Sequence, residues 1–209
     1  MRILLLIILF PLAVVAQSKA DSVQLSQRYL EDQFYAGVTY NFVLSQPDLV
    51  NQRNFSYGLQ AGFIRDLPLN KDRTIGLGIG VGLSLNTYYT NIRAQETTNG
   101  VEYSIITDFD FKRSKLETHL LEIPIEFRWR NSDPETYSFW RVYTGIKLGY
   151  AFDSRSKFVI DNLKESFVND DVQKLQYGIT MNFGYHNFNI HMYYSLTSLF
   201  EDGVLVDEQ

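Results

Sequence analysis

The chain of 209 residues carries a formal net charge of −5, contains no cysteine, and is rich in aromatic side chains, with 14 Tyr, 15 Phe and 2 Trp. The absence of cysteine excludes disulfide frameworks, thiol nucleophiles and cysteine-ligated zinc. The charge is acidic and scattered instead of gathered into a basic block, which argues against nucleic acid as a partner.

The N-terminus has the organisation of a secretory signal. Arg2 precedes an apolar run from Ile3 to Val15 that ends in small residues at Ala16, so we predict a signal peptide over 1–16 and a periplasmic segment over 17–33. An uncleaved anchor is the alternative, but thirteen apolar residues are fewer than the roughly 20 that a spanning helix needs. No later segment has even a dozen consecutive apolar residues, so any membrane crossing must use strands.

Residues Thr74 to Asn86 show the clearest strand pattern. Isoleucine, leucine and valine occupy one parity, while the other parity holds four glycines, namely Gly76, Gly78, Gly80 and Gly82. Side chains alternate between the two faces of a strand, so one face is apolar and the other nearly bare. A spacing of two does not match the G-x-G-x-x-G nucleotide motif. Four glycines in register instead suggest crowding, as the inside of a narrow barrel would produce.

Seven segments share this period of two, and we expect each to be a strand. They are Phe34–Leu44, Phe55–Phe63, Thr74–Asn86, Leu121–Arg130, Trp140–Phe152, Leu175–Tyr185 and Phe188–Leu196. The links between them alternate long and short, which is typical of outer-membrane barrels, although a soluble β-sandwich also has alternating strands. We therefore predict an all-β fold, a small antiparallel up-and-down transmembrane barrel over 34–196, with about eight strands expected and seven visible.

Seven strands leave two unpaired edges, which lipid does not tolerate. We expect a seam between the first and the last strand, filled by a strand from another subunit or, as the family resemblance of this chain implies, by a further strand beyond Gln209. Residues 197–209 are then an extracellular tail or the start of a connection to that last strand.

Five charged residues have the inward parity of two neighbouring strands, namely Glu122, Glu126, Arg128, Arg141 and Lys147. A turn centred near Pro134 would place Glu122 opposite Lys147 and Glu126 diagonal to Arg141. The set could act as a charge relay or a selectivity lining. We favour a structural role, because a narrow lumen must neutralise the charges that it encloses. Pro124 lies in the same strand, cannot donate a ladder hydrogen bond, and predicts a bulge or kink.

The long link from Thr90 to Thr118 has apolar residues at alternating positions, namely Tyr103, Ile105, Phe109 and Phe111. We interpret it as a protruding hairpin whose aromatic side chains form a candidate docking arm. No catalytic, metal or cofactor site is expected: His191 and Ser195 share one face of a strand but would lie roughly 13 Å apart, too far for a base and its nucleophile.

Three stretches carry a resemblance to a known family: FSYGLQAGFIRD from Phe55 to Asp66, the glycine-alternating strand from Gly76 to Gly82, and LEIPIE from Leu121 to Glu126. They resemble the PorT family of small outer-membrane β-barrels. The resemblance implies export to the outer membrane and a non-enzymatic accessory role in type IX protein secretion, with lipid and other secretion proteins as partners. A general small barrel for adhesion, surface protection or envelope integrity is the alternative, and a barrel enzyme acting on lipid or peptide is the third.

Overall fold

A computed structural model describes residues 32–208, apart from 45, 48, 108–110, 132–139, 186–187, 202 and 205. The regular structure of these residues is entirely β, and none of it is a helix long and apolar enough to cross a membrane. The predicted signal peptide, Ala16 and most of the predicted periplasmic segment lie outside the described residues.

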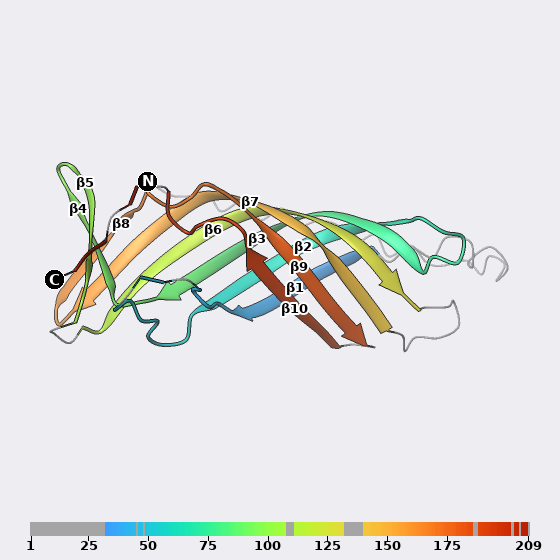
Figure 1. Cartoon of the computed structure of the whole chain (residues 1–209), viewed down its shortest axis with the longest axis horizontal. Helices are drawn as coiled ribbons and strands as arrows, with labels where there is room; N and C mark the ends of the chain where they lie inside the picture. The colour runs from blue at the N-terminus through green and yellow to red at the C-terminus, as the bar shows by residue number, and fades with distance from the viewer. Residues whose placement is uncertain are drawn as a thin grey trace, which may run out of the picture.

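Seven antiparallel strands form one continuous, curled sheet, seen as the long tilted arrows of Figure 1. Their order in the sheet is their order in the chain, which is the up-and-down topology that the seven segments predicted. The strands are β1 (Gln33–Tyr40), β2 (Tyr57–Pro68), β3 (Ile75–Tyr89), β6 (Arg113–Arg130), β7 (Trp140–Ile160), β9 (Leu175–Tyr185) and β10 (Phe188–Ser195).

The remaining strands gather at one end of this sheet, at the left of Figure 1. β4 (Ile92–Thr97) and β5 (Gly100–Ile105) form a hairpin, and β11 (Val206–Glu208) adds to β5 in parallel. β8 (Leu163–Val168) pairs with the far half of β7. The links at this end, 41–56, 90–112 and 161–174, are long, whereas those at the other end, 69–74, 131–139 and 186–187, are short. Long loops lie outside in such barrels, so we assign this end to the cell surface.

Side chains of the seven strands divide into an apolar outer face and a polar inner face. On β3, for example, Val81 is 52 % exposed, while Ser84 on the other parity is buried. On β6, Leu121 and Phe127 point outward, whereas Glu122 between them is buried. An apolar outer face with a charged interior reverses the arrangement of a soluble sandwich and is stable only against lipid.

Part of the way along β6 and β7, the two faces exchange their chemical character. Before Leu120, the outward positions of β6 carry charged groups, such as Lys115 and Glu117, and the inward positions carry Leu116 and Thr118, which are buried. The pairing register of β6 and β7 shifts between His119 and Leu120. Such a bulge changes the direction in which the side chains of one strand point. We therefore place here the boundary between the part of the wall that lies in the bilayer and the part that belongs to a water-exposed domain.

Two sequence expectations about strand geometry were wrong. β6 and β7 have 18 and 21 residues, longer than the expected nine to thirteen, because both continue beyond the membrane. The bulge expected at Pro124 is absent, because the register of β6 against β3 is the same at Ile125 and at Glu122 and its register against β7 is continuous there, although the β3–β6 ladder is interrupted at Pro124 and Ile123, which have no paired residue on β3. Proline removes one hydrogen-bond donor, but it does not by itself insert a residue.

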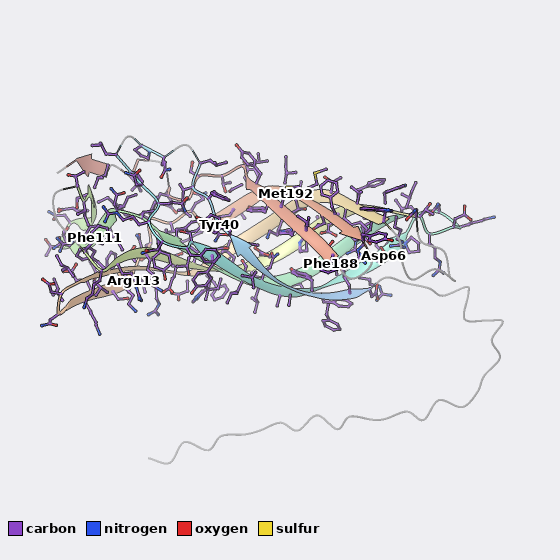
Figure 2. All side chains as sticks on the ribbon, turned by 90° about the horizontal axis from the view of Figure 1, so that it is seen from below. Tyr40, Asp66, Phe111, Arg113, Phe188 and Met192 are labelled. Atoms are coloured by element: carbon purple, nitrogen blue, oxygen red, sulfur yellow. The ribbon has the colours of Figure 1, made fainter. Side chains whose placement is uncertain are left out.

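β1 and β10 are the two edges of the curled sheet. β1 pairs only with β2, and β10 only with β9, among the residues that the structure describes. Figure 2 shows both strands on the near side of the molecule, with Tyr40 labelled on β1 and Met192 on β10. The seam that seven strands predicted therefore lies between these two edges.

Candidate functional site

The short-turn end of the lumen is filled by a cluster of enclosed charges. Asp66 at the end of β2 receives a bidentate pair of hydrogen bonds from Arg130, at 3.0 Å to Oδ1 and 2.7 Å to Oδ2. Arg128 Nη1 lies 3.4 Å from Asp66 Oδ1, and Arg128 Nε lies 3.1 Å from Glu126 Oε2. The side chains of Asp66, Arg128 and Arg130 are 0 % exposed. The cluster thus joins β2 to β6 inside the barrel.

The chain of contacts continues from Glu126 across the lumen. Asn182 on β9 donates from Nδ2 to Glu126 Oε1 at 3.1 Å, and its Oδ1 lies 2.7 Å from His191 Nδ1 on β10. Tyr143 on β7 lies under the guanidinium of Arg128, 4.6 Å from ring centroid to Cζ. Polar contacts therefore cross the lumen from β2 to the edge strand β10.

A second cluster lies nearer the middle of the barrel. Lys147 Nζ on β7 is 3.0 Å from Glu122 Oε1 on β6, and the same carboxylate oxygen accepts a hydrogen bond from Ser84 on β3 at 2.7 Å. Lys147 also lies 3.4 Å from Gln60 Oε1 and above the ring of Tyr193, 4.5 Å from its centroid. These contacts give the enclosed lysine a carboxylate, an amide and an aromatic face.

The six enclosed charges of the two clusters balance. Asp66, Glu122 and Glu126 supply three negative charges, and Arg128, Arg130 and Lys147 supply three positive ones. Above them is a cavity of about 1350 Å³ that Glu122 and Lys147 line but Asp66, Arg128 and Arg130 do not. The lumen is thus open towards the surface end and occupied by side chains at the periplasmic end.

The four glycines of β3 make room for this interior. A Cβ at Gly78 would lie 2.5 Å from Arg128 Nε, and one at Gly76 would lie 3.1 Å from Asp66 Oδ1. A Cβ at Gly82 would meet the Tyr35 hydroxyl, and one at Gly80 would lie 2.7 Å from Ile64 Cγ1. Glycine is needed on this face of β3 because side chains of the neighbouring strands and, at Gly80, the backbone of Phe63 and Ile64 occupy the space above it.

The predicted register of the inward charges was wrong by two residues. Glu122 lies opposite Gly149, and the residue opposite Lys147 is Pro124. Lys147 still reaches Glu122, because a long side chain spans a diagonal pair. Arg141 lies opposite Arg130 and next to Gly184 on β9, so it is not diagonal to Glu126. The pairing of Arg130 with Arg141 places the centre of the hairpin between 135 and 136, one residue beyond the predicted centre.

Several members of the clusters were not singled out from the sequence. Arg130 has the inward parity of β6 and could have been included on that ground. Asp66 could not, because the strand was expected to end at Phe63. Ser84 and Asn182 occupy inward positions on β3 and β9, but nothing in the sequence distinguishes them from other polar inward residues.

The contact between Glu122 and Lys147 yields a test in its own right. We expect Glu122→Gln and Lys147→Met each to destabilise the barrel, and the double variant to be more stable than the sum of the two losses implies, with a coupling of about 0.5–3 kcal/mol. Unfolding in urea of protein refolded in detergent measures all three. The exposed pair Arg155 and Asp153, 3.1 Å apart on β7, is the control and should couple by less than about 1 kcal/mol. Additive losses at Glu122 and Lys147 would contradict the ion pair.

A folded domain, here called the outer cap, lies at the surface end and is made of β4, β5, β8, β11 and the far halves of β6 and β7. Tyr103 on β5 donates from its hydroxyl within 2.9 Å of Asn169 Oδ1 and 3.0 Å of Asp171 Oδ2, and its ring packs against Phe200. Burial raises the pKa of Tyr103 above its usual range, so the hydroxyl stays protonated. The segment after β10 is thereby held against β5.

The candidate docking arm is therefore corrected. Tyr103 and Ile105 are 4 % and 2 % exposed and form the core of the outer cap, not an exposed surface. Phe111 is half-buried against Phe158, with the guanidinium of Arg53 on its ring. Phe109 lies outside the described residues. Alternating apolar residues in water indicate a buried face, and here Tyr103 lies against Phe200 and the link residues Asn169 and Asp171.

No group of three or more histidine, aspartate or glutamate side chains among the described residues could hold a metal ion. Ser195 donates to the backbone oxygen of Thr197, and His191 contacts Asn182, so the two residues belong to separate local networks.

Comparison with protein families identifies the family of the chain. A family model described as "Outer membrane protein beta-barrel domain" matches residues 15–201, a range that includes every strand of the curled sheet. No curated protein and no solved structure gives a significant match to the chain.

Proposed function

The chain belongs to the outer membrane protein β-barrel domain family, and from that premise we propose that it is a non-enzymatic docking component of type IX protein secretion, anchored in the outer membrane by its barrel. One observation carries the docking role: the periplasmic end of the lumen is filled by the cluster of Asp66, Arg128 and Arg130, all fully enclosed. A barrel of about eight strands is only wide enough to be filled by side chains. Such a barrel holds partners and does not conduct cargo.

The secretion role is supported by the PorT-like stretches, which include the residues that build the lumen. Glu122 and Glu126 belong to the LEIPIE stretch, and Asp66 ends the FSYGLQAGFIRD stretch. The outer cap supplies a folded surface on the cell exterior, which suits the binding of other secretion proteins. Partners of this class are expected to contact the exposed strands of the outer cap.

Gene deletion tests the secretion role in the native bacterium. We expect type IX cargo to accumulate inside the cells of the deletion strain and to return to the surface when the gene is restored. Normal export of cargo in the deletion strain would contradict the proposal.

A conductance measurement tests docking against transport. Purified protein inserted into a planar bilayer is expected to show no stable single-channel conductance, because the enclosed side chains of Asp66, Arg128 and Arg130 block the periplasmic end of the lumen. A stable, ion-selective conductance would contradict a docking role even if secretion depends on the gene.

Adhesion or surface protection is the second candidate, favoured by apolar side chains on the outer cap. Leu163 and Val168 on β8 are 51 % and 49 % exposed and lie in the part of the chain that we assign to the cell surface. Normal cargo export combined with loss of surface binding in the deletion strain would favour this function.

A further inference from the structure

Charged side chains gather on the outward face of the outer cap, just above the lipid-facing part of β6 and β7. This face spans three neighbouring strands, since β6 pairs with β7 and β7 pairs with β8. It is here called the cationic wall and carries the two carboxylates Glu117 and Asp153 and five cations, namely Arg113, Lys115, Arg155, Lys157 and Lys164. The wall therefore has three positive charges in excess, although the whole chain carries a net charge of −5.

The pairing of the strands brings the cations of the wall close together. Lys115 on β6 lies directly opposite Lys157 on β7, and in the next row Val159 lies between Arg113 and Lys164. Side chains directly opposite each other have Cβ atoms about 5 Å apart, and like charges at that distance destabilise a sheet. An anion that binds to the wall from outside would offset this repulsion.

The two carboxylates of the wall are already engaged. Glu117 forms an ion pair with Lys115, whose side chain is only 9 % exposed, and Asp153 lies 3.1 Å from Arg155 Nε. The three remaining cations form no ion pair with any residue that the structure describes. They are Arg113, Lys157 and Lys164. The wall thus offers positive charge that the described chain does not neutralise.

The height of the wall above the lipid-facing surface indicates which negative groups it meets. The lipid-facing part of β6 and β7 ends near His119, which lies opposite Asp153, and Lys157 is four residues further along β7. Four residues of a strand span about 13 Å, which a strand tilt of about 40° reduces to about 10 Å of height. Lipid headgroups extend about 5–8 Å beyond the hydrocarbon core, and a long lysine side chain bridges the remaining distance.

The opposite end of the same strands has a different outer face. Outward positions that the structure describes at the periplasmic end of β6 and β7 hold apolar side chains, including Phe127, Trp129 and Trp140, and no lysine or arginine. Figure 2 shows Arg113 at the surface end, far from Asp66 at the periplasmic end. The excess of cations on these two strands is therefore confined to the level of the outer leaflet.

We propose that the cationic wall binds the phosphate groups of outer-leaflet lipids, so that anionic lipid gathers on the β6–β8 side of the barrel. Arg113 and Lys157 contact the phosphates, because neither is engaged by a carboxylate. Each cation near an anionic membrane surface contributes a factor of about five in binding. The inference rests on the membrane boundary near His119 and does not depend on the secretion role.

Quenching of tryptophan fluorescence by brominated lipids shows which lipid lies beside a chosen side chain. The full chain is reconstituted in mixed vesicles of phosphatidylcholine and phosphatidylglycerol, with bromine on the acyl chains of one lipid or of the other. The variant Trp129→Phe/Trp140→Phe/Phe152→Trp has its sole tryptophan beside the wall, whereas both native tryptophans lie at the periplasmic end. We expect phosphatidylglycerol to be preferred about fivefold or more beside the wall, with little preference at the native tryptophans.

Charge variants of the same reporter chain identify the residues that bind. Arg113→Gln/Lys157→Gln should lower the preference to that of the native tryptophans, and Asp153→Asn should raise it because a carboxylate is lost. The matched control is Arg65→Gln/Lys71→Gln, which removes two exposed cations at the periplasmic end and should leave the preference unchanged. An unchanged preference in Arg113→Gln/Lys157→Gln would overturn the proposal.

Free phosphate is the other source of the same anionic group. Inorganic phosphate should lower the preference no more than sodium chloride of equal ionic strength does, because both salts then act only by screening. A selective loss in phosphate would mean that the wall binds soluble phosphate and would overturn its assignment to lipid. Equal quenching by the two lipids beside the wall, or equal preference at the two ends of β6 and β7, would also overturn the proposal.

Discussion

Replacing Asp66 with alanine is expected to cost about 3–5 kcal/mol of barrel stability, the loss expected when an enclosed ion pair loses one partner. The carboxylate holds Arg130 through two hydrogen bonds and lies 3.4 Å from Arg128. All three side chains are fully enclosed, so neither water nor salt can replace the lost negative charge. Urea unfolding in detergent, followed by tryptophan fluorescence, measures the loss.

Two further variants show whether the loss comes from enclosed charge. Arg155→Ala removes a partner of Asp153 on β7, but Arg155 is 54 % exposed, and we expect a loss below about 1 kcal/mol. The double variant Asp66→Leu/Arg130→Met replaces an enclosed pair with apolar groups and should recover part of the Asp66→Ala loss. An Asp66→Ala loss no larger than that of Arg155→Ala would show that the cluster is not enclosed in solution.

Periodicity was sufficient for the sidedness of the strands but not for their register. The alternation in β6 puts Glu122, Glu126 and Arg128 on one face whatever strand lies beside it. Which residue of β7 lies opposite depends on the hairpin turn, and 132–139 could hold turns of several lengths. A change of one residue would have moved the whole apolar face to the lumen, whereas a change of two leaves every side chain on its own face. The sequence pattern therefore cannot detect an error of two.

The inward position of Asp66 is not predicted by the sequence, because the neighbouring charged residue Arg65 interrupts the strand pattern. Arg65 and Asp66 form a charged pair directly before Leu67 and Pro68, which is typical of a turn. In the structure β2 continues to Pro68, with Arg65 exposed and Asp66 buried. An enclosed charge can be predicted only when the residues that neutralise it are known. The partners of Asp66 lie on β6, more than sixty residues later in the chain.

Periodicity alone predicts the wrong exposure for residues of the outer cap, because it does not show whether a strand lies in lipid or in water. The same alternation places apolar groups outward in lipid and inward in water, and the change of medium near His119 leaves the period of β6 intact. The bulge between β6 and β7 lies between His119 and Leu120, where no proline or glycine indicates it in the sequence. Alternation therefore suggests that Tyr103 and Ile105 are exposed, whereas both are buried in the outer cap, with Phe200 against the ring of Tyr103.

Replacing Val81 with arginine is expected to cost about 2–4 kcal/mol, because it places a charge on the lipid face near the middle of β3. The matched control is Leu163→Arg on β8. The two residues are 52 % and 51 % exposed, but Leu163 lies in the outer cap, where arginine meets water and a change within about 0.5 kcal/mol is expected. Urea unfolding of both variants in lipid vesicles measures the difference between their losses of stability. The exposed fraction of the side chain cannot explain that difference, because it is nearly the same at the two sites. Equal losses at the two sites would mean that the apolar outer face is not covered by lipid, and the assignment of the membrane boundary near His119 would fail with it.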